Sequence, residues 1–146
     1  MVRNILKRLG LWINHRDYRG LGDTKRAKEL HERVLKIKEK YYGKEHIETA
    51  FTLGYLGSDY TALKKAGLGK SYLEESLKIK ELYYGMEHPL VADTLMELGN
   101  AYKSLKDFKQ AETHLKRAFF TNQRAILWSV PSFNNGGKKA ISGKSR

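Results

Sequence analysis

The sequence predicts an all-α protein, an α-solenoid of antiparallel helix hairpins, and two observations support this prediction. The first is an internal repeat: residues 35–64 align with residues 77–106, 42 positions later, with 18 identities in 30 positions. Unrelated segments would share about two. The second is the spacing of apolar residues inside each copy, which follows the helical period of 3.6 residues. Repeats of this length bury their apolar faces only against neighbouring repeats, so a stacked array is expected.

Two helices of one kind are predicted at about residues 47–63 and 89–105. Each follows a loop of the pattern Tyr-Tyr-Gly-x-Glu-His. The loop glycine, Gly43 or Gly85, suits the position just past a helix end, and Pro89 suits the first turn of the next helix. Each helix carries an apolar stripe at i, i+3, i+4 and i+7. The stripes are Leu53, Leu56, Gly57 and Tyr60 in the first helix and Leu95, Leu98, Gly99 and Tyr102 in the second.

Glycine in the middle of a helix costs about 1 kcal/mol against alanine. Gly57 and Gly99 are therefore predicted to be points where a partner helix comes close.

Helices of a second kind are predicted at about residues 23–42, 67–84 and 107–128. Each has a small residue at the same register, and Asp23 and Asp107 are suited to cap the first and third of these helices. The small residues are Ala27, Gly69 and Ala111. Because short turns join the two kinds of helix, each pair should form an antiparallel hairpin.

The repeat pattern fades at both ends of the chain. We expect residues 1–20 to hold a degenerate first helix, residues 21–128 the repeat array, and residues 129–146 a disordered basic tail. The net charge is +12, and the first and last of these segments contribute +4 each, which leaves 12 − 8 = +4 for the array. A basic nucleic-acid face built into the array is therefore not expected, whereas the two basic ends could attract RNA or an acidic membrane surface.

No pattern in the sequence supports catalysis or metal binding. The absence of cysteine excludes disulfides and thiolate metal sites and favours a cytoplasmic location, and there is no HExxH motif. His46 and His88 are one motif position seen twice, and each is predicted to cap the following helix or pack on its loop. The lysines between Glu39 and Glu81 are predicted to form a solvated face. We therefore expect no enzyme, no metal and no cofactor.

The pattern Leu-x-x-Leu-Gly-x-x-Tyr, followed by a small residue and a leucine, resembles the tetratricopeptide repeat. It is carried by Leu53, Leu56, Gly57 and Tyr60 with Gly69 and Leu73, and by Leu95, Leu98, Gly99 and Tyr102 with Ala111 and Leu115. A repeat of 42 residues, rather than the usual 34, is similar to that of kinesin light chains. About two and a half to three repeats are present. The resemblance implies a right-handed superhelix in which the first helix of each pair lines a concave groove that holds an extended peptide.

The groove residues that this resemblance implies are offset from the packing stripe. They are Phe51, Gly54, Tyr55, Ser58, Thr61 and Ala62 in the first full repeat, and Asp93, Met96, Glu97, Asn100, Lys103 and Ser104 in the second. Those predicted to contact a partner are Tyr55, Ser58, Thr61, Asp93, Met96, Asn100 and Lys103. An amide such as Asn100 can both donate to and accept from a peptide backbone, and Lys103 could meet a carboxylate.

The predicted function is a protein-interaction scaffold or adaptor, similar to kinesin light chains, that binds an acidic peptide with an aromatic anchor. One alternative is a truncated or self-associating piece of a longer array, because the last predicted helix leaves an apolar end uncovered. That end comprises Leu115, Phe119, Phe120, Ile126, Leu127 and Trp128. A second alternative is binding of RNA or an acidic membrane surface by the basic termini.

Overall fold

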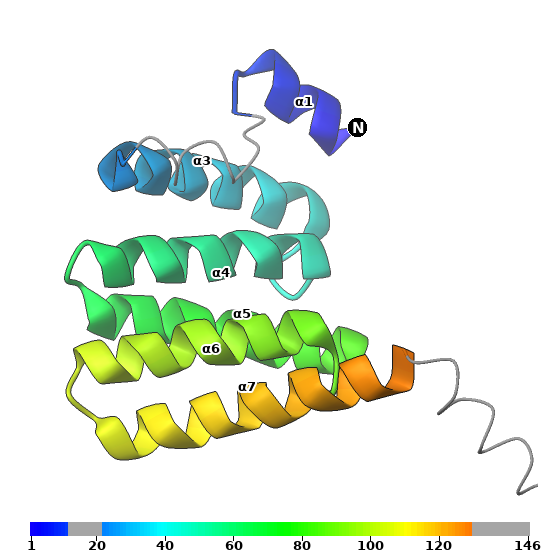
Figure 1. Ribbon diagram of the computed structural model, residues 1–146. Coiled ribbons are helices and arrows are strands. Elements are labelled where there is room, and N and C mark those ends of the chain that lie inside the picture. Colours follow the sequence, from blue (N-terminus) through cyan, green and yellow to red (C-terminus); the bar gives the residue numbers. More distant parts are fainter. Residues whose placement is uncertain (12–21, 130–146) are drawn as a thin grey trace, which may run out of the picture.

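The computed structural model describes residues 1–11 and 22–129 (Figure 1). The helices of this part of the chain are α1 (Val2–Arg8), α3 (Thr24–Tyr42), α4 (Ile47–Ala62), α5 (Ala66–Tyr84), α6 (Pro89–Ser104) and α7 (Phe108–Ser129). The helices from α3 to α7 lie side by side as successive antiparallel rods. The described residues contain no strand, and the predicted all-α solenoid of helix hairpins is confirmed. None of the helices in these two ranges has the length and apolar character needed to cross a bilayer.

The predicted helices at 23–42, 47–63, 67–84, 89–105 and 107–128 agree with the observed bounds to within one residue at each end. Residues 12–20 of the predicted first helix and residues 130–146 of the predicted tail lie outside the described residues, so these two predictions stay predictions. Within the first of these segments, α1 covers Val2–Arg8.

The helix ends carry the predicted caps. The Asp23 carboxylate accepts a hydrogen bond from the Arg26 N–H at 3.1 Å, and Asp107 does the same for Gln110 at 3.2 Å. At the other ends, Gly43 and Gly85 adopt φ values of 92° and 87°, which a glycine reaches without steric strain.

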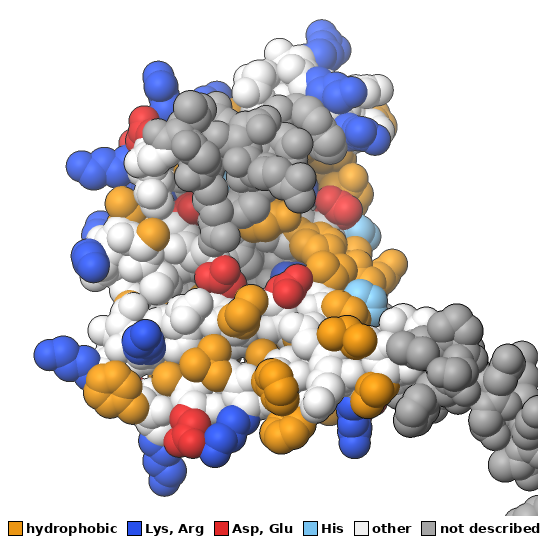
Figure 2. Space-filling model, in the orientation of Figure 1, with side chains coloured by type: hydrophobic (Ala, Val, Ile, Leu, Met, Phe, Trp, Pro, Cys, Tyr) orange, Lys and Arg blue, Asp and Glu red, His pale blue; other side chains and the backbone are white. Residues whose placement is uncertain are grey.

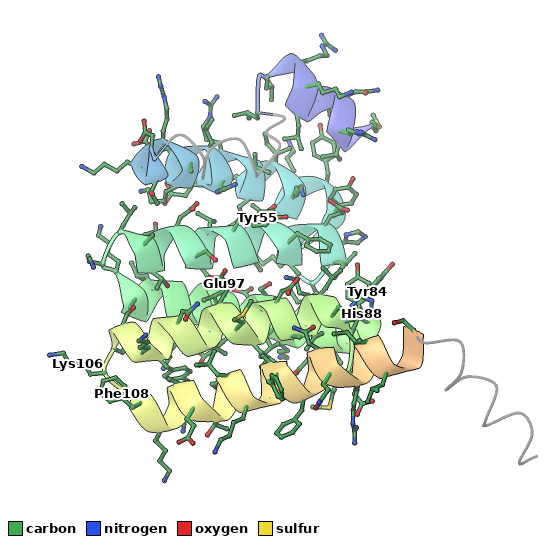
Figure 3. The ribbon with its side chains drawn as sticks, in the orientation of Figure 1. Tyr55, Tyr84, His88, Glu97, Lys106 and Phe108 are labelled. Atoms are coloured by element: carbon green, nitrogen blue, oxygen red, sulfur yellow. The ribbon has the colours of Figure 1, made fainter. Side chains whose placement is uncertain are left out.

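His46 and His88 cap α4 and α6 through the same pair of contacts. Nδ1 of His88 accepts from the Leu90 N–H at 3.2 Å, and Nδ1 of His46 accepts from the Glu48 N–H at 3.1 Å. The His88 ring also stacks on Tyr84 with 4.3 Å between ring centroids (Figure 3). Both predicted roles, capping the helix and packing on the loop, are therefore present together.

Gly57 and Gly69 let α4 and α5 approach closely. A Cβ atom on Gly57 would lie 2.5 Å from Cγ of Leu73 and 2.9 Å from the Gly69 carbonyl oxygen, inside van der Waals contact. A Cβ on Gly99 would lie 2.7 Å from Cγ of Leu115 on α7. The predicted close contacts at Gly57 and Gly99 are confirmed.

The apolar stripes meet in successive layers of the stack. Leu35 and Ile79 join α4 in one cluster, around Leu53 and Leu56. A second cluster joins α5, α6 and α7, and its buried residues are Leu73, Leu77, Val91, Leu95, Leu98, Ala101 and Ala118. Each layer is thus closed by the helix that follows it, as a stacked array requires.

Candidate peptide-binding groove

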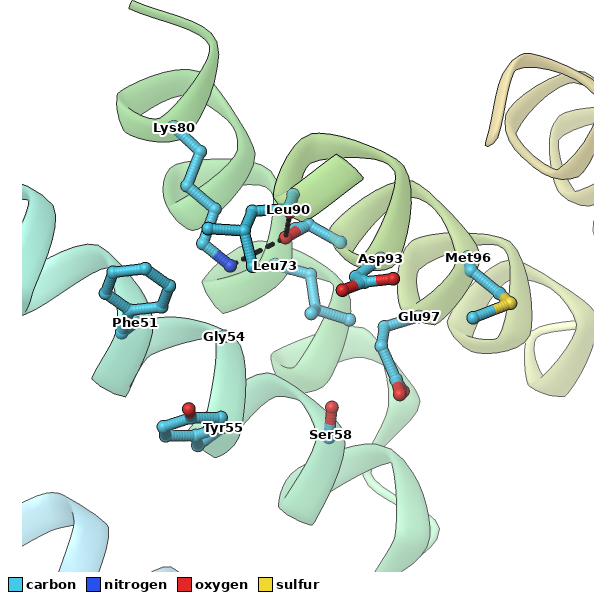
Figure 4. Close-up of a pocket in the computed structure, with 11 residues that line it drawn as sticks. Phe51, Gly54, Tyr55, Ser58, Leu73, Lys80, Leu90, Asp93, Met96 and Glu97 are labelled. Atoms are coloured by element: carbon cyan, nitrogen blue, oxygen red, sulfur yellow. Dashed lines mark hydrogen bonds between the residues drawn. The ribbon is translucent and has the colours of Figure 1, made fainter. Parts of the chain in front are cut away.

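A cavity of about 290 Å³ opens between α4 and α6, with α5 beneath it (Figure 4). Its position follows from the array: the first helices of two successive hairpins form the walls, and the second helix of the first hairpin forms the floor. The lining residues are Phe51, Gly54, Tyr55 and Ser58 from α4, Leu73 and Lys80 from α5, and Leu90, Asp93, Thr94, Met96 and Glu97 from α6. Figure 2 shows acidic and hydrophobic side chains beside one another in the middle of this face.

Lys80 brings a cation to the floor of this cavity. Its side chain is 7% exposed, and its ammonium donates to the Thr94 hydroxyl at 2.8 Å. The same ammonium lies 5.0 Å from the centroid of the Phe51 ring, a cation–π distance. The Thr94 hydroxyl in turn donates to the Leu90 carbonyl oxygen at 3.1 Å. Side chains from three helices therefore hold the ammonium at the base of the opening.

Burial lowers the pKa of Lys80 from 10.5 to about 8, because the charged form loses its hydration. The carboxylates of Asp93 and Glu97 oppose this shift by favouring the charged form. At neutral pH the cavity thus holds a partly desolvated cation with two carboxylates along the α6 wall. The site carries both signs of charge.

Four of the seven predicted contact residues line the cavity: Tyr55, Ser58, Asp93 and Met96. Tyr55 on α4 and Glu97 on α6 lie on opposite walls of the cavity (Figure 4). Three further residues of the predicted groove side, Phe51, Gly54 and Glu97, also line it. The structure thus brings side chains from both repeats to one opening. Their role in binding a partner stays a prediction.

Thr61, Asn100 and Lys103 lie outside the cavity. The Thr61 hydroxyl donates to the Gly57 carbonyl oxygen at 2.9 Å and sits against Gly69, so it faces α5 rather than the opening. Asn100 and Lys103 are exposed on α6, beyond the residues that form the cavity wall. These two side chains can contact only a ligand that extends past the cavity along α6.

Lys80 was not predicted as a site residue, and the predicted solvated lysine face is wrong at this position. The side chain is buried because Leu73, Leu77 and Lys80 follow one another at i, i+4 and i+7, on the stripe of α5 that packs against α6. Lys38, 42 residues earlier, is also largely covered and donates to the Glu48 carboxylate at 3.0 Å. The recurrence of a lysine at the same position of the apolar stripe in both repeats could have indicated that Lys80 is buried.

The fold defines a helical-repeat protein, and the family comparison identifies the repeat. Two models, both described as tetratricopeptide repeat, match residues 16–48 and 55–119. The chain belongs to the tetratricopeptide repeat proteins. Equivalent helices follow one another at the 42-residue spacing predicted from the sequence, as the starts of α4 at Ile47 and α6 at Pro89 show.

Solved structures agree with this fold. The chain superposes on the crystal structure of a candidate kinesin light chain from Podosopora anserina, with nearly identical TPR-like repeats, at a TM-score of 0.70. The identity is 24%, over 82% of this chain and 56% of the other. A single-residue variant of that protein gives a TM-score of 0.69 with the same identity and coverage. The chain therefore spans little more than half the length of these neighbours, and at this identity the similarity shows the fold alone. A comparison with curated protein sequences finds no significant match.

Proposed function

We propose that this chain is a protein-interaction scaffold that holds a segment of a partner protein in the cavity between α4 and α6. The observation that supports the proposal best is the Lys80 ammonium. It can donate three hydrogen bonds, and within the described residues one bond, to Thr94, is formed. A buried donor with remaining capacity, at the base of an open cavity, is suited to an acceptor that a ligand brings.

The lining indicates what such a segment should contain. Phe51, Tyr55 and Met96 offer apolar contact to one aromatic or large aliphatic side chain. Lys80 offers hydrogen bonds to a carboxylate or a carbonyl oxygen beside that side chain. We therefore propose an extended peptide with an aromatic anchor and an acidic neighbour, running on along α6 toward Asn100 and Lys103. Asp93 and Glu97 should limit how many acidic residues the cavity accepts, because like charges repel at short range.

Fluorescence anisotropy can test this proposal with two labelled peptides that differ only in charge. One has a central tryptophan flanked by acidic residues, and the other has lysines in place of the acids. We expect saturable binding of the acidic peptide, weakened at least about tenfold by Lys80→Met, the effect of losing a charge-assisted hydrogen bond. Lys78→Met is the matched control, because Lys78 is exposed on α5 outside the cavity.

Two further results would decide the details of the proposal. A loss of affinity in Asn100→Ala would show that the peptide continues along α6 beyond the cavity. If neither peptide binds, or if Lys80→Met and Lys78→Met change affinity equally, the cavity is not the binding site.

A cytoplasmic location, supported by the absence of cysteine, is part of the proposal.

A second candidate role, self-association through the end of the array, is favoured by a different observation. Large apolar side chains of α7 are exposed, among them Phe108, Phe119 and Ile126. None of them lines the cavity, so the two roles are compatible.

A further inference from the structure

α7 closes the described stack and carries an uncovered apolar stripe. It runs directly beside α6, and its Arg117 side chain also pairs with Glu81 on α5 (Figure 1). Phe108, Leu115, Phe119 and Ile126 are 65%, 37%, 63% and 65% exposed. Because a helix turns about 100° per residue, spacings of 7, 4 and 7 place these four side chains within about 40° of one line along it. The stripe is therefore a continuous edge rather than a scatter of single residues.

The two earlier helices of the same kind show what normally covers this edge. Leu35 on α3 and Leu77 on α5 occupy the register of Phe119, and both are buried by the helix that follows. Phe119 has no such helix in the described part of the chain. A surface that the repeat is built to bury is thus left open at this end.

Two polar residues complete the edge in coiled-coil spacing. Glu112 and Asn122 fall between the apolar residues, so positions 108, 112, 115, 119, 122 and 126 follow alternating steps of four and three. That alternation is the seam of a helix that packs against another helix along its whole length.

The residues of the seam are arranged symmetrically about its midpoint at position 117. Counted outward from Arg117, Leu115 and Phe119 are equidistant, as are Glu112 and Asn122, and Phe108 and Ile126. An antiparallel second copy of α7 would therefore set apolar residues against apolar residues. It would also set the Asn122 amide, a donor, against the Glu112 carboxylate, an acceptor.

We propose that two copies of this chain pair through α7, antiparallel, about a two-fold axis that crosses the seam midway between Leu115 and Phe119. This deepens the second candidate role by naming the partner and its register. A two-fold interface uses the same patch on both copies and closes after two chains. It needs a surface that is complementary to itself, which the symmetrical seam of α7 provides.

The apolar edge could also be covered by head-to-tail stacking, in which the first helix of a second copy would pack on α7 as α4 packs on α3. The charges on α7 argue against this arrangement. At the α3–α4 junction, Tyr60 donates to Glu32 at 2.5 Å, and Lys28 lies 5.5 Å from the Tyr60 ring. At the α5–α6 junction the same arrangement joins Tyr102 with Glu74 and Lys70.

On α7 the order is reversed, because Glu112 stands at the lysine register and Lys116 at the glutamate register, 2.6 Å apart. A tyrosine arriving there would meet a carboxylate against its electron-rich ring face. The junction that holds successive repeats together is therefore absent from α7.

Sedimentation velocity of the full chain tests the pairing, from about 1 µM to about 1 mM, the range in which an interface of modest area dissociates. We expect a monomer–dimer equilibrium that Phe119→Glu weakens at least about tenfold, because it buries a charge at the centre of the seam. The matched control is Phe120→Glu, which changes the adjacent and similarly exposed side chain about 100° away around the helix. Circular dichroism should show that both variants stay folded.

Engineered cysteines test the register, because the chain has no native cysteine. Glu112→Cys and Asn122→Cys chains should form a disulfide only when mixed. Two copies of Asn122→Cys alone would hold their thiols about 15 Å apart along the helices, too far for a bond.

A strict monomer at every concentration would overturn the proposal, as would a dimer that Phe119→Glu leaves intact. Polymers larger than two chains, or cross-links within either single variant, would show a different assembly. Peptide binding by the monomeric Phe119→Glu chain would keep the groove proposal separate from this result.

Discussion

Nδ1 of His31 lies 2.6 Å from a carboxylate oxygen of Asp59, and both side chains are buried where α3 packs on α4. The repeat places Leu73 and Ala101 at the equivalent positions, 42 residues later. Both of these residues are buried in the apolar cluster between α5 and α6. The same junction is therefore built once with a polar pair and once with apolar side chains.

We predict that Asp59→Ala lowers the free energy of unfolding by about 3 kcal/mol, because it leaves a buried histidine without this acceptor. The double variant His31→Leu with Asp59→Ala copies the next repeat and should be at least about 1 kcal/mol more stable than Asp59→Ala alone. Urea denaturation followed by circular dichroism measures both values. Additive losses in the double variant would show that the pair is not coupled.

Gly57→Ala tests the close contact between α4 and α5. Since its Cβ would lie 2.5 Å from Leu73 and 2.9 Å from the Gly69 backbone, the two helices must move apart. We expect a loss of about 2 kcal/mol, typical of overpacking. Gly67→Ala is the control, because a Cβ there meets nothing within 4 Å, and it should add about 0.5 kcal/mol. Equal effects in thermal melts of the two variants would refute the contact.

The Lys80 ammonium should make stability depend on pH in the alkaline range. Its pKa is about 8 in the folded chain, against an ordinary value of 10.5. Below pH 8 both states are charged, and the penalty for burying the charge is present in full. Between pH 8 and 10.5 the folded state releases its proton first, so the wild-type chain should gain stability relative to Lys80→Met.

The size of this gain follows from the shift in pKa. It should be on the order of 3 kcal/mol, since one unit is worth about 1.4 kcal/mol. Urea denaturation at a series of pH values measures it, with Lys78→Met as the exposed control. A constant difference between wild type and Lys80→Met from pH 7 to pH 10.5 would contradict the lowered pKa.

Local features made the helices predictable. The bounds of α3 to α7 agree with the sequence to within one residue, because glycine, proline, aspartate and histidine act on backbone groups within a few residues of themselves. The internal repeat revealed the stacking, since equivalent stripes at a constant spacing must meet in equivalent ways. Four of the seven contact residues that the family resemblance implied line the cavity.

The burial of individual polar side chains was decided by the tertiary structure. In the sequence Lys80 resembles the exposed lysines around it, but in the structure α6 covers it. Thr61 faces Gly69 because Gly57 and Gly69 let α4 and α5 approach closely. The sequence by itself determined the class, the repeat and the helix ends, because these depend on local and periodic patterns. Only the packing of helices decided which charges lie at the base of the cavity and which apolar edge stays open, because burial depends on neighbours far away in the chain.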